Sequence, residues 1–261
     1  MTKVDVTPTP WTILRGLTPA RIALGRAGSS LPTAPHLEFQ MAHARARKVV
    51  HLGLDVPTLN AELAPLGLAV LSLASAAENR AAYLQRPDLG RRLDAPSRAA
   101  LVPASGKYDL AIVVGDGLSA LAIQKNAVPF LTLVLPMMQS QGLSLAPISI
   151  VTQARVAIGD DIGASLGAQM VLVMIGERPG LSSPDSMGLY LTHRPRTGLT
   201  DESRNCISNV RGAGLSYPEA AQKLMFLMTQ ARKLGLSGIH LKDEAEALAP
   251  PEGRPNFLIG D

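Results

Sequence analysis

The stretch Leu110–Gly117, which reads LAIVVGDG, decides the fold class of this chain. It is a short apolar run rich in β-branched residues and closed by turn-forming glycines, which predicts a parallel strand covered on both faces. Three later runs of the same kind predict further strands at Ile148–Thr152, Met170–Ile175 and Met187–Thr192.

Helical patterns lie before and between these predicted strands. They are expected from Thr33 to Val49, over Pro57–Leu66 with Thr58 and Asn60 as caps, over Ser119–Asn126 and Val128–Gln141, over Ile162–Leu166 capped by Asp160 and Asp161, and from Pro218 to Ala231. Strands that alternate with helices imply right-handed βαβ units and a parallel sheet. We therefore predict an α/β fold with an open, mostly parallel, Rossmann-like sheet flanked by helices and preceded by an N-terminal helical segment.

The same pattern divides the chain into three parts. Residues 1–100 are expected to form an N-terminal arm and helical segment, because residues 1–35 contain five prolines and the Gly25–Ser30 loop. Residues 101–245 are expected to form the ligand-binding α/β domain. Residues 246–261, which include Pro250 and Pro251, are expected to form an irregular tail.

Composition narrows the class of protein. Hydrophobic residues make up 46% of the 261 residues and charged residues 18%, below the roughly 25% of an average domain, which favours surface burial against another subunit. The net charge is +4, but aromatic residues are only 3%, so nucleic-acid binding is not expected.

The longest apolar stretch, around Leu131–Met138, is shorter than the roughly 20 residues of a membrane span. The single cysteine, Cys206, fits a reducing cytoplasm.

Candidate ligand-binding residues follow the predicted strands. Ligands of open α/β sheets bind outside the carboxyl ends of the strands. Asp116–Ser119, Arg155-Val156 and Glu177–Gly180 occupy three such ends. Glu177 follows a buried strand directly, so it requires an ion-pair partner such as Arg178 or acts as an acceptor for donor groups of a polar ligand.

Other kinds of site find less support. Cys206 lacks a recognisable nucleophile signature, so a buried or ligand-contacting cysteine is favoured over a catalytic one. His36 and His43 lie about 10 Å apart along the predicted helix, too far to share a metal ion. Neither a dinucleotide-binding nor a P-loop glycine motif occurs. From these patterns alone the chain is an α/β protein with a ligand site at its strand ends, in a complex or as a stand-alone binding module.

Five segments carry a resemblance to a known family. They are Ala20–Gly28 (ARIALGRAG), Tyr83–Leu93 (YLQRPDLGRRL), Asp116–Ser119 (DGLS), Gly176–Leu181 (GERPGL) and Asn205–Asn209 (NCISN). In this order they resemble the small, or light, subunit of ethanolamine ammonia-lyase over about residues 18–240. The resemblance implies an enzyme subunit that is inactive alone and that covers one side of adenosylcobalamin against a large catalytic subunit, with six copies of each subunit. The joint reaction converts ethanolamine to acetaldehyde and ammonia.

The resemblance also implies cofactor-binding residues. They are Val156, Glu177 and Cys206, with no catalytic residue and no metal ligand in this chain. No Asp-x-His-x-x-Gly pattern occurs, so the cofactor is expected to keep its own base on cobalt. A cytoplasmic location is implied, and packaging in a bacterial microcompartment is in question because the N-terminal arm is shorter than in some relatives.

Overall fold

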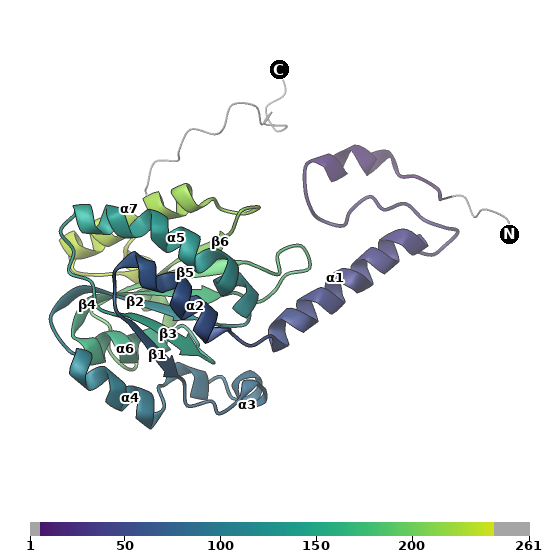
Figure 1. Cartoon of the computed structure of the whole chain (residues 1–261). Coiled ribbons are helices and arrows are strands. Elements are labelled where there is room, and N and C mark those ends of the chain that lie inside the picture. Colours follow the sequence, from purple (N-terminus) through teal and green to yellow (C-terminus); the bar gives the residue numbers. More distant parts are fainter. Residues whose placement is uncertain (1–5, 243–261) are drawn as a thin grey trace, which may run out of the picture.

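The computed structural model describes residues 6–242, in which helices cover both faces of one six-stranded sheet (Figure 1). The strand order is β1-β3-β2-β4-β5-β6. The strands are β1 Val70–Ala74, β2 Tyr108–Gly115, β3 Ile148–Thr152, β4 Ala168–Gly176, β5 Met187–His193 and β6 Arg204–Val210. Strands β1, β3, β2 and β4 are parallel to one another, and β5 is antiparallel to β4 and β6. The expected fold class, an open and mostly parallel sheet flanked by helices, is confirmed.

The four strands expected from apolar runs are present as β2, β3, β4 and β5, whereas β1 and β6 were not expected. Both of these lie at the edges of the sheet. An edge strand has one neighbour and one partly exposed face, so it does not need the continuous apolar run that marks a central strand. In strand β6 only every third residue is buried, namely Arg204, Ile207 and Val210.

Seven α-helices accompany the sheet in the described range 6–242. They are α1 Thr33–His51, α2 Val56–Leu63, α3 Arg80–Gln85, α4 Ala95–Leu101, α5 Ala120–Ser140, α6 Ile158–Leu166 and α7 Tyr217–Leu234. Helices α2, α5 and α7 share one apolar core with the sheet, and α4 and α6 share the second core. Helices α3 and α4 were not expected from the sequence.

Helix α5 is one continuous helix, although two segments were expected on either side of Ala127. Pro129 and Pro136 lie inside it, and each removes one backbone hydrogen bond. Buried residues continue through the helix from Ala120 to Met138, so packing outweighs that loss. Within residues 6–242, α5 is the one helix long and apolar enough to cross a membrane, and half of its most apolar window is buried inside the fold.

The caps expected for two helices, Thr58 and Asn60 for α2 and Asp160 and Asp161 for α6, are wrong. Asp55 caps α2 by accepting a hydrogen bond from the backbone N–H of Thr58. Helix α6 begins at Ile158, so Asp160 and Asp161 lie inside its first turn. Each carboxylate instead forms an ion pair with an arginine, because burial of an unpaired carboxylate is costly. Asp160 pairs with Arg204 of β6, and Asp161 pairs with Arg98 of α4.

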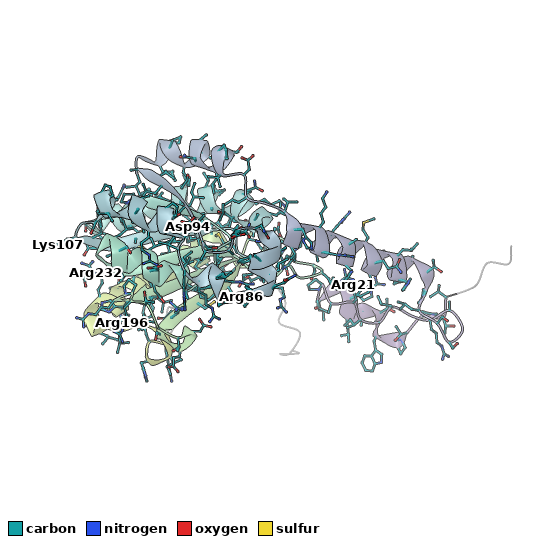
Figure 2. The ribbon with its side chains drawn as sticks, turned by 90° about the horizontal axis from the view of Figure 1, so that it is seen from below. Arg21, Arg86, Asp94, Lys107, Arg196 and Arg232 are labelled. Carbon is teal, nitrogen blue, oxygen red and sulfur yellow. The ribbon has the colours of Figure 1, made fainter. Side chains whose placement is uncertain are left out.

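The N-terminal arm extends away from the α/β body. Figure 2 shows α1 and the segment that carries Arg21 projecting to one side. Only Ala46 and Val49 of α1 are buried, near the end of the helix that joins the body. The division of the chain near residue 100 stays a prediction, although β1 lies in the range expected to be an arm and helices. The expected tail at 246–261 lies outside the described residues.

Candidate functional site

The strand order reverses at the pair β2 and β4, and the candidate site lies at their carboxyl ends. After β2 the chain crosses to β3 on one side, and after β3 it crosses back to β4 on the other. Such a reversal leaves a crevice for ligands above the strand ends. Two glycines allow the loops to approach each other there, because a Cβ on Gly117 would lie 2.1 Å from the carbonyl oxygen of Gly176. The backbone N–H of Leu118 donates to that same carbonyl.

Asp116 fixes the loop that follows β3. Its buried carboxylate accepts hydrogen bonds from the backbone N–H groups of Gln153 and Ala154, at 3.0 and 2.9 Å. Arg80 lies 3.4 Å away and provides the opposite charge. Gln153 adopts a left-handed backbone with φ of 56°, which turns the chain toward the site. Desolvation raises the pKa of Asp116, and the hydrogen bonds and Arg80 oppose that shift.

A cavity of about 690 Å³ opens where these loops meet. Its lining combines apolar surface with hydrogen-bonding and charged groups. It consists of Pro19, Tyr83, Gly117, Leu118, Arg155, Val156, Ile175, Gly176, Glu177, Arg178, Ser182, Ser183, Ser186, Tyr190, Ser208, Asn209 and Arg211. The residues come from the ends of several strands and from the N-terminal arm. Val156 and Glu177, two of the three expected ligand-binding residues, therefore lie in one cavity.

Glu177 is held in place by three donors from two segments. Its carboxylate accepts hydrogen bonds from the Oγ of Ser186, from the Oγ of Ser208 at 2.6 Å and from the backbone N–H of Asn209 at 3.1 Å. Within the described residues its partners are these donors, and the ion pair considered for Arg178 does not form. A carboxylate offers about four acceptor positions. About one position therefore remains for a ligand.

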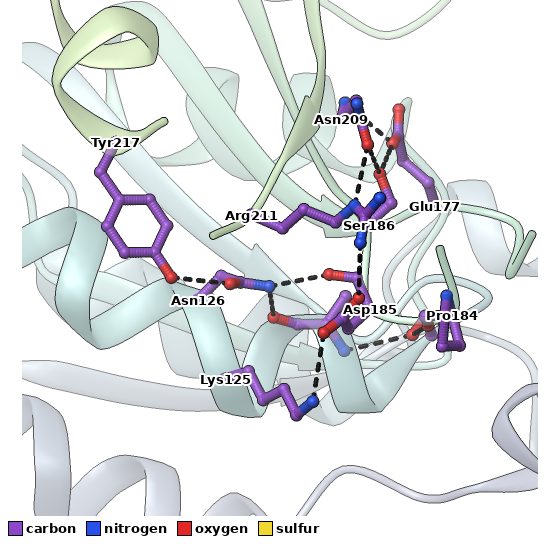
Figure 3. Close-up of polar contacts among 11 residues, drawn as sticks. Lys125, Asn126, Glu177, Pro184, Asp185, Ser186, Asn209, Arg211 and Tyr217 are labelled. Atoms are coloured by element: carbon purple, nitrogen blue, oxygen red, sulfur yellow. Dashed lines mark hydrogen bonds and ion pairs between the residues drawn. The ribbon is translucent and has the colours of Figure 1, made fainter. Parts of the chain in front are cut away.

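A polar network anchors the 177–186 loop to the helices behind it (Figure 3). Arg211 donates to the side chain of Asn209 at 3.0 Å and pairs with Asp185 at 3.5 Å. Asp185 also pairs with Lys125 of α5, and its carbonyl accepts from Asn126. The hydroxyl of Tyr217 in α7 donates to the Asn126 side chain at 2.7 Å. The network thus connects the loop with both helices.

Arg155 lies against a buried aromatic ring. Its guanidinium carbon is 4.3 Å from the centroid of the Tyr83 ring, and its backbone N–H donates to Gly90. Tyr83 is fully buried, and its hydroxyl donates to the carbonyl of Ala154 at 3.0 Å. A Cβ on Gly90 would lie 2.8 Å from the Cγ of Arg155 and 3.1 Å from the Tyr83 ring. The motif YLQRPDLGRRL therefore builds a support for Arg155.

Cys206, the third expected residue, lies on strand β6 and not on a strand-end loop. It is exposed and sits opposite Tyr190 of β5 in the sheet register. Tyr190 lines the cavity, whereas Cys206 is not part of the lining. Desolvation raises the pKa of the Cys206 thiol, the Tyr190 hydroxyl lowers it, and the Glu177 carboxylate raises it further. Whether Cys206 contacts a ligand stays a prediction.

Several site residues were missed by sequence reasoning. Ser208 and Asn209 belong to the segment NCISN that carried the family resemblance, so that motif contained a signal for them. Ser186 and Arg211 had no such signal. They reach the site because β5 and β6 pair antiparallel beside β4, a relationship that local patterns do not reveal. The described residues contain no cluster of three or more His, Cys, Asp or Glu side chains suited to a metal ion.

Comparison with known proteins identifies the family. The family described as ethanolamine ammonia-lyase light chain (EutC) matches residues 8–242. The ethanolamine ammonia-lyase small subunit of Ralstonia nicotianae is 56% identical over 99% of this chain and 97% of that protein. The protein of the same name from Azotobacter vinelandii is 57% identical over 98% of this chain and 97% of its own length. The chain therefore belongs to the ethanolamine ammonia-lyase light chain family, whose members are small subunits of that enzyme.

Proposed function

We propose that this chain is the small subunit of an adenosylcobalamin-dependent ethanolamine ammonia-lyase and that its strand-end cavity holds one side of the cofactor. A large subunit would close the other side and bind ethanolamine. The observation that carries the proposal is the cavity where Val156 and Glu177 meet at the reversal of strand order. Family membership supports the enzyme class, and the reaction we propose degrades ethanolamine to acetaldehyde and ammonia.

The chemistry of the lining fits this cofactor. The rim of the corrin carries amides that both donate and accept hydrogen bonds. Glu177 has about one acceptor position left, and guanidinium groups of the lining supply donors. Val156, Leu118 and Ile175 supply apolar surface against which a macrocycle can lie. In addition, the buried Nε of Arg155 has no hydrogen-bond partner among residues 6–242, as expected of a site that a ligand completes.

The roles of this chain's residues are binding and orientation. Adenosylcobalamin supplies the radical chemistry when it is bound. Glu177 would accept from a corrin amide, and its three donors keep the carboxylate from rotating away. Val156 would contact the macrocycle, and Cys206 would add a small, soft contact beside Tyr190. Binding with the cofactor's own base on cobalt stays a prediction.

The N-terminal arm supports a partner chain. Nine of the exposed large apolar side chains belong to it: Val6, Trp11, Ile13, Leu17, Ile22, Leu31, Leu37, Phe39 and Met41. A concentration of this kind marks a surface that another protein covers. Pro19 of the same arm also lines the cavity, so one partner can cover both. An assembly of six large and six small subunits, a cytoplasmic location and packaging in a microcompartment stay predictions.

Co-expression with a large subunit of ethanolamine ammonia-lyase tests the proposal. We expect a stable complex that binds adenosylcobalamin and releases ammonia from ethanolamine, while the isolated chain is inactive. Glu177→Gln should weaken cofactor binding by about tenfold to a hundredfold and leave assembly intact, because the loss of one charged hydrogen bond costs about 1.5–3 kcal/mol. Glu62→Gln, on helix α2 outside the cavity, is the matched control. Failure to form a stable complex, with or without adenosylcobalamin, would favour a stand-alone binding module. An assembled complex without cofactor affinity would refute the proposed cofactor site.

A further inference from the structure

The cavity has more positive charge than its own residues neutralise. Three arginines and one glutamate line it. Arg211 is paired with Asp185, and Glu177 is satisfied by neutral donors. Arg155 and Arg178 have no carboxylate partner anywhere in the described part of the chain. Two guanidinium groups therefore remain uncompensated in one cavity.

Arg155 is the better positioned of the two. Its guanidinium lies over the Tyr83 ring, and Gly90 leaves room for its Cγ. Its terminal nitrogen makes one long hydrogen bond of 3.4 Å to the Tyr83 carbonyl, and its buried Nε makes none. An arginine stacked on a ring loses less conformational freedom when it binds a ligand. The remaining N–H groups are thus prepared for an acceptor that the protein does not supply.

We propose that Arg155, assisted by Arg178, forms an anion subsite that takes the phosphodiester of adenosylcobalamin. The inference rests on the proposed function. The corrin's side chains are neutral amides, which Glu177 and the serines can satisfy, and the phosphodiester is the negatively charged group on the periphery of this cofactor. Guanidinium groups bind phosphate oxygens through paired, charge-assisted hydrogen bonds. Arg155 and Arg178, which have no carboxylate partner among the described residues, can provide these hydrogen bonds to the phosphodiester.

The test compares two cofactor analogues in the assembled complex. Adenosylcobinamide lacks the phosphate and the nucleotide base, whereas adenosylcobinamide methyl phosphate keeps the phosphate and lacks the base. Dissociation constants are measured by equilibrium dialysis in phosphate-free buffer. For the wild-type complex we expect the phosphate analogue to bind about tenfold more tightly. Arg155→Gln should remove this preference, Arg178→Gln should reduce it, and Arg155→Lys should keep part of it. Arg196→Gln, an exposed arginine outside the cavity, should leave it unchanged.

The outcomes separate the subsite from the function on which it depends. If the wild-type complex binds neither analogue nor adenosylcobalamin, the proposed function fails. If Arg155→Gln weakens both analogues equally, the phosphate subsite is wrong while cofactor binding stands. Loss of assembly in both Arg155→Gln and Arg155→Lys would show that Arg155 is required for contact with the large subunit, which also overturns the subsite.

Discussion

The Oγ of Ser208 donates a 2.6 Å hydrogen bond to Oε1 of Glu177, and this bond connects the end of β6 with the end of β4. The two residues are 31 positions apart in the chain. Strand β5 lies between their strands in the sheet. The carboxylate that follows a central strand is therefore oriented by an edge strand, which makes the edge strand part of the site.

Ser208→Ala tests this relationship. The change removes one of the three hydrogen-bond donors to Glu177. Its carboxylate should therefore spend less time in the orientation that binds the cofactor. We expect cofactor affinity in the assembled complex to fall about threefold to tenfold, as for loss of a modest hydrogen bond. Thermal stability should stay nearly unchanged because Ser208 is exposed. Ser140→Ala, at the end of α5, removes a hydroxyl of similar exposure away from the cavity and should have no effect. Equal affinity in both variants would show that Ser208 does not orient Glu177.

The reactivity of the Cys206 thiol tests whether Tyr190 and Glu177 lie close to it. Cys206 is the single cysteine of the chain, so a thiol-alkylating reagent modifies one cysteine only. Desolvation raises the pKa of the thiol above 9.0, the Tyr190 hydroxyl lowers it, and Glu177 raises it. The pH midpoint for reaction with iodoacetamide should therefore lie above 9.0, fall in Glu177→Gln and rise in Tyr190→Phe. Identical midpoints in wild type and Glu177→Gln would contradict this arrangement.

Gly90 leaves room for Arg155, which predicts a specific intolerance of larger residues. A Cβ at this position would lie 2.8 Å from the Cγ of Arg155 and 3.0 Å from the backbone oxygen of Gln153. Gly90→Ala should destabilise the chain by about 1–3 kcal/mol, because both neighbours must move. In Gly53→Ala the added Cβ meets no atom within 4 Å, and this control should be neutral or slightly stabilising. Urea unfolding measures both, and equal stabilities would refute the close contact.

The burial of Tyr83 leads us to expect that the free energy of unfolding depends on pH. Burial raises the pKa of its hydroxyl from 10.0 to about 12, so the native protein keeps a proton that the unfolded chain releases. The contribution of the neutral hydroxyl is complete below pH 10 and is lost as the pH rises toward 12. Tyr83→Phe should be less stable than wild type near pH 8, since the bond to Ala154 is lost. The difference should narrow above pH 10 in urea titrations, and a constant difference would argue against the shift.

The central sheet could be predicted from the sequence because burial on both faces leaves an unmistakable local pattern. Strands β2 and β4 contain the apolar runs Leu110–Val114 and Met170–Ile175, and β3 is apolar or β-branched except at Ser149. The edge strand β6 carries no such run and contains Arg204 and Asn205, whereas the edge strand β1, which reads VLSLA, is as apolar as β3 and was nevertheless not expected. Arg204 is nevertheless buried, because Asp160 lies 44 residues earlier in the chain and neutralises it. Pairing over such a separation is invisible to any local pattern.

The same distinction between local patterns and tertiary packing applies to the residues of the candidate site. The rule that ligands bind at strand ends predicts, from the sequence alone, a site at the loops containing Val156 and Glu177. The sequence did not reveal that Ser208 and Asn209 hold Glu177, or that Tyr83 and Gly90 support Arg155. Both sets of contacts join segments that only tertiary packing brings together. The short motifs that carry the family resemblance contain most of these residues.

A structure of the assembled complex with adenosylcobalamin bound is the most direct test of the central claim. The claim is that the strand ends of this chain form the cofactor-facing half of a site completed by a large subunit. We predict that the corrin lies against Val156 and within hydrogen-bonding distance of the Glu177 carboxylate, with Cys206 beside it. A cofactor held entirely by the large subunit, away from these three residues, would contradict the account.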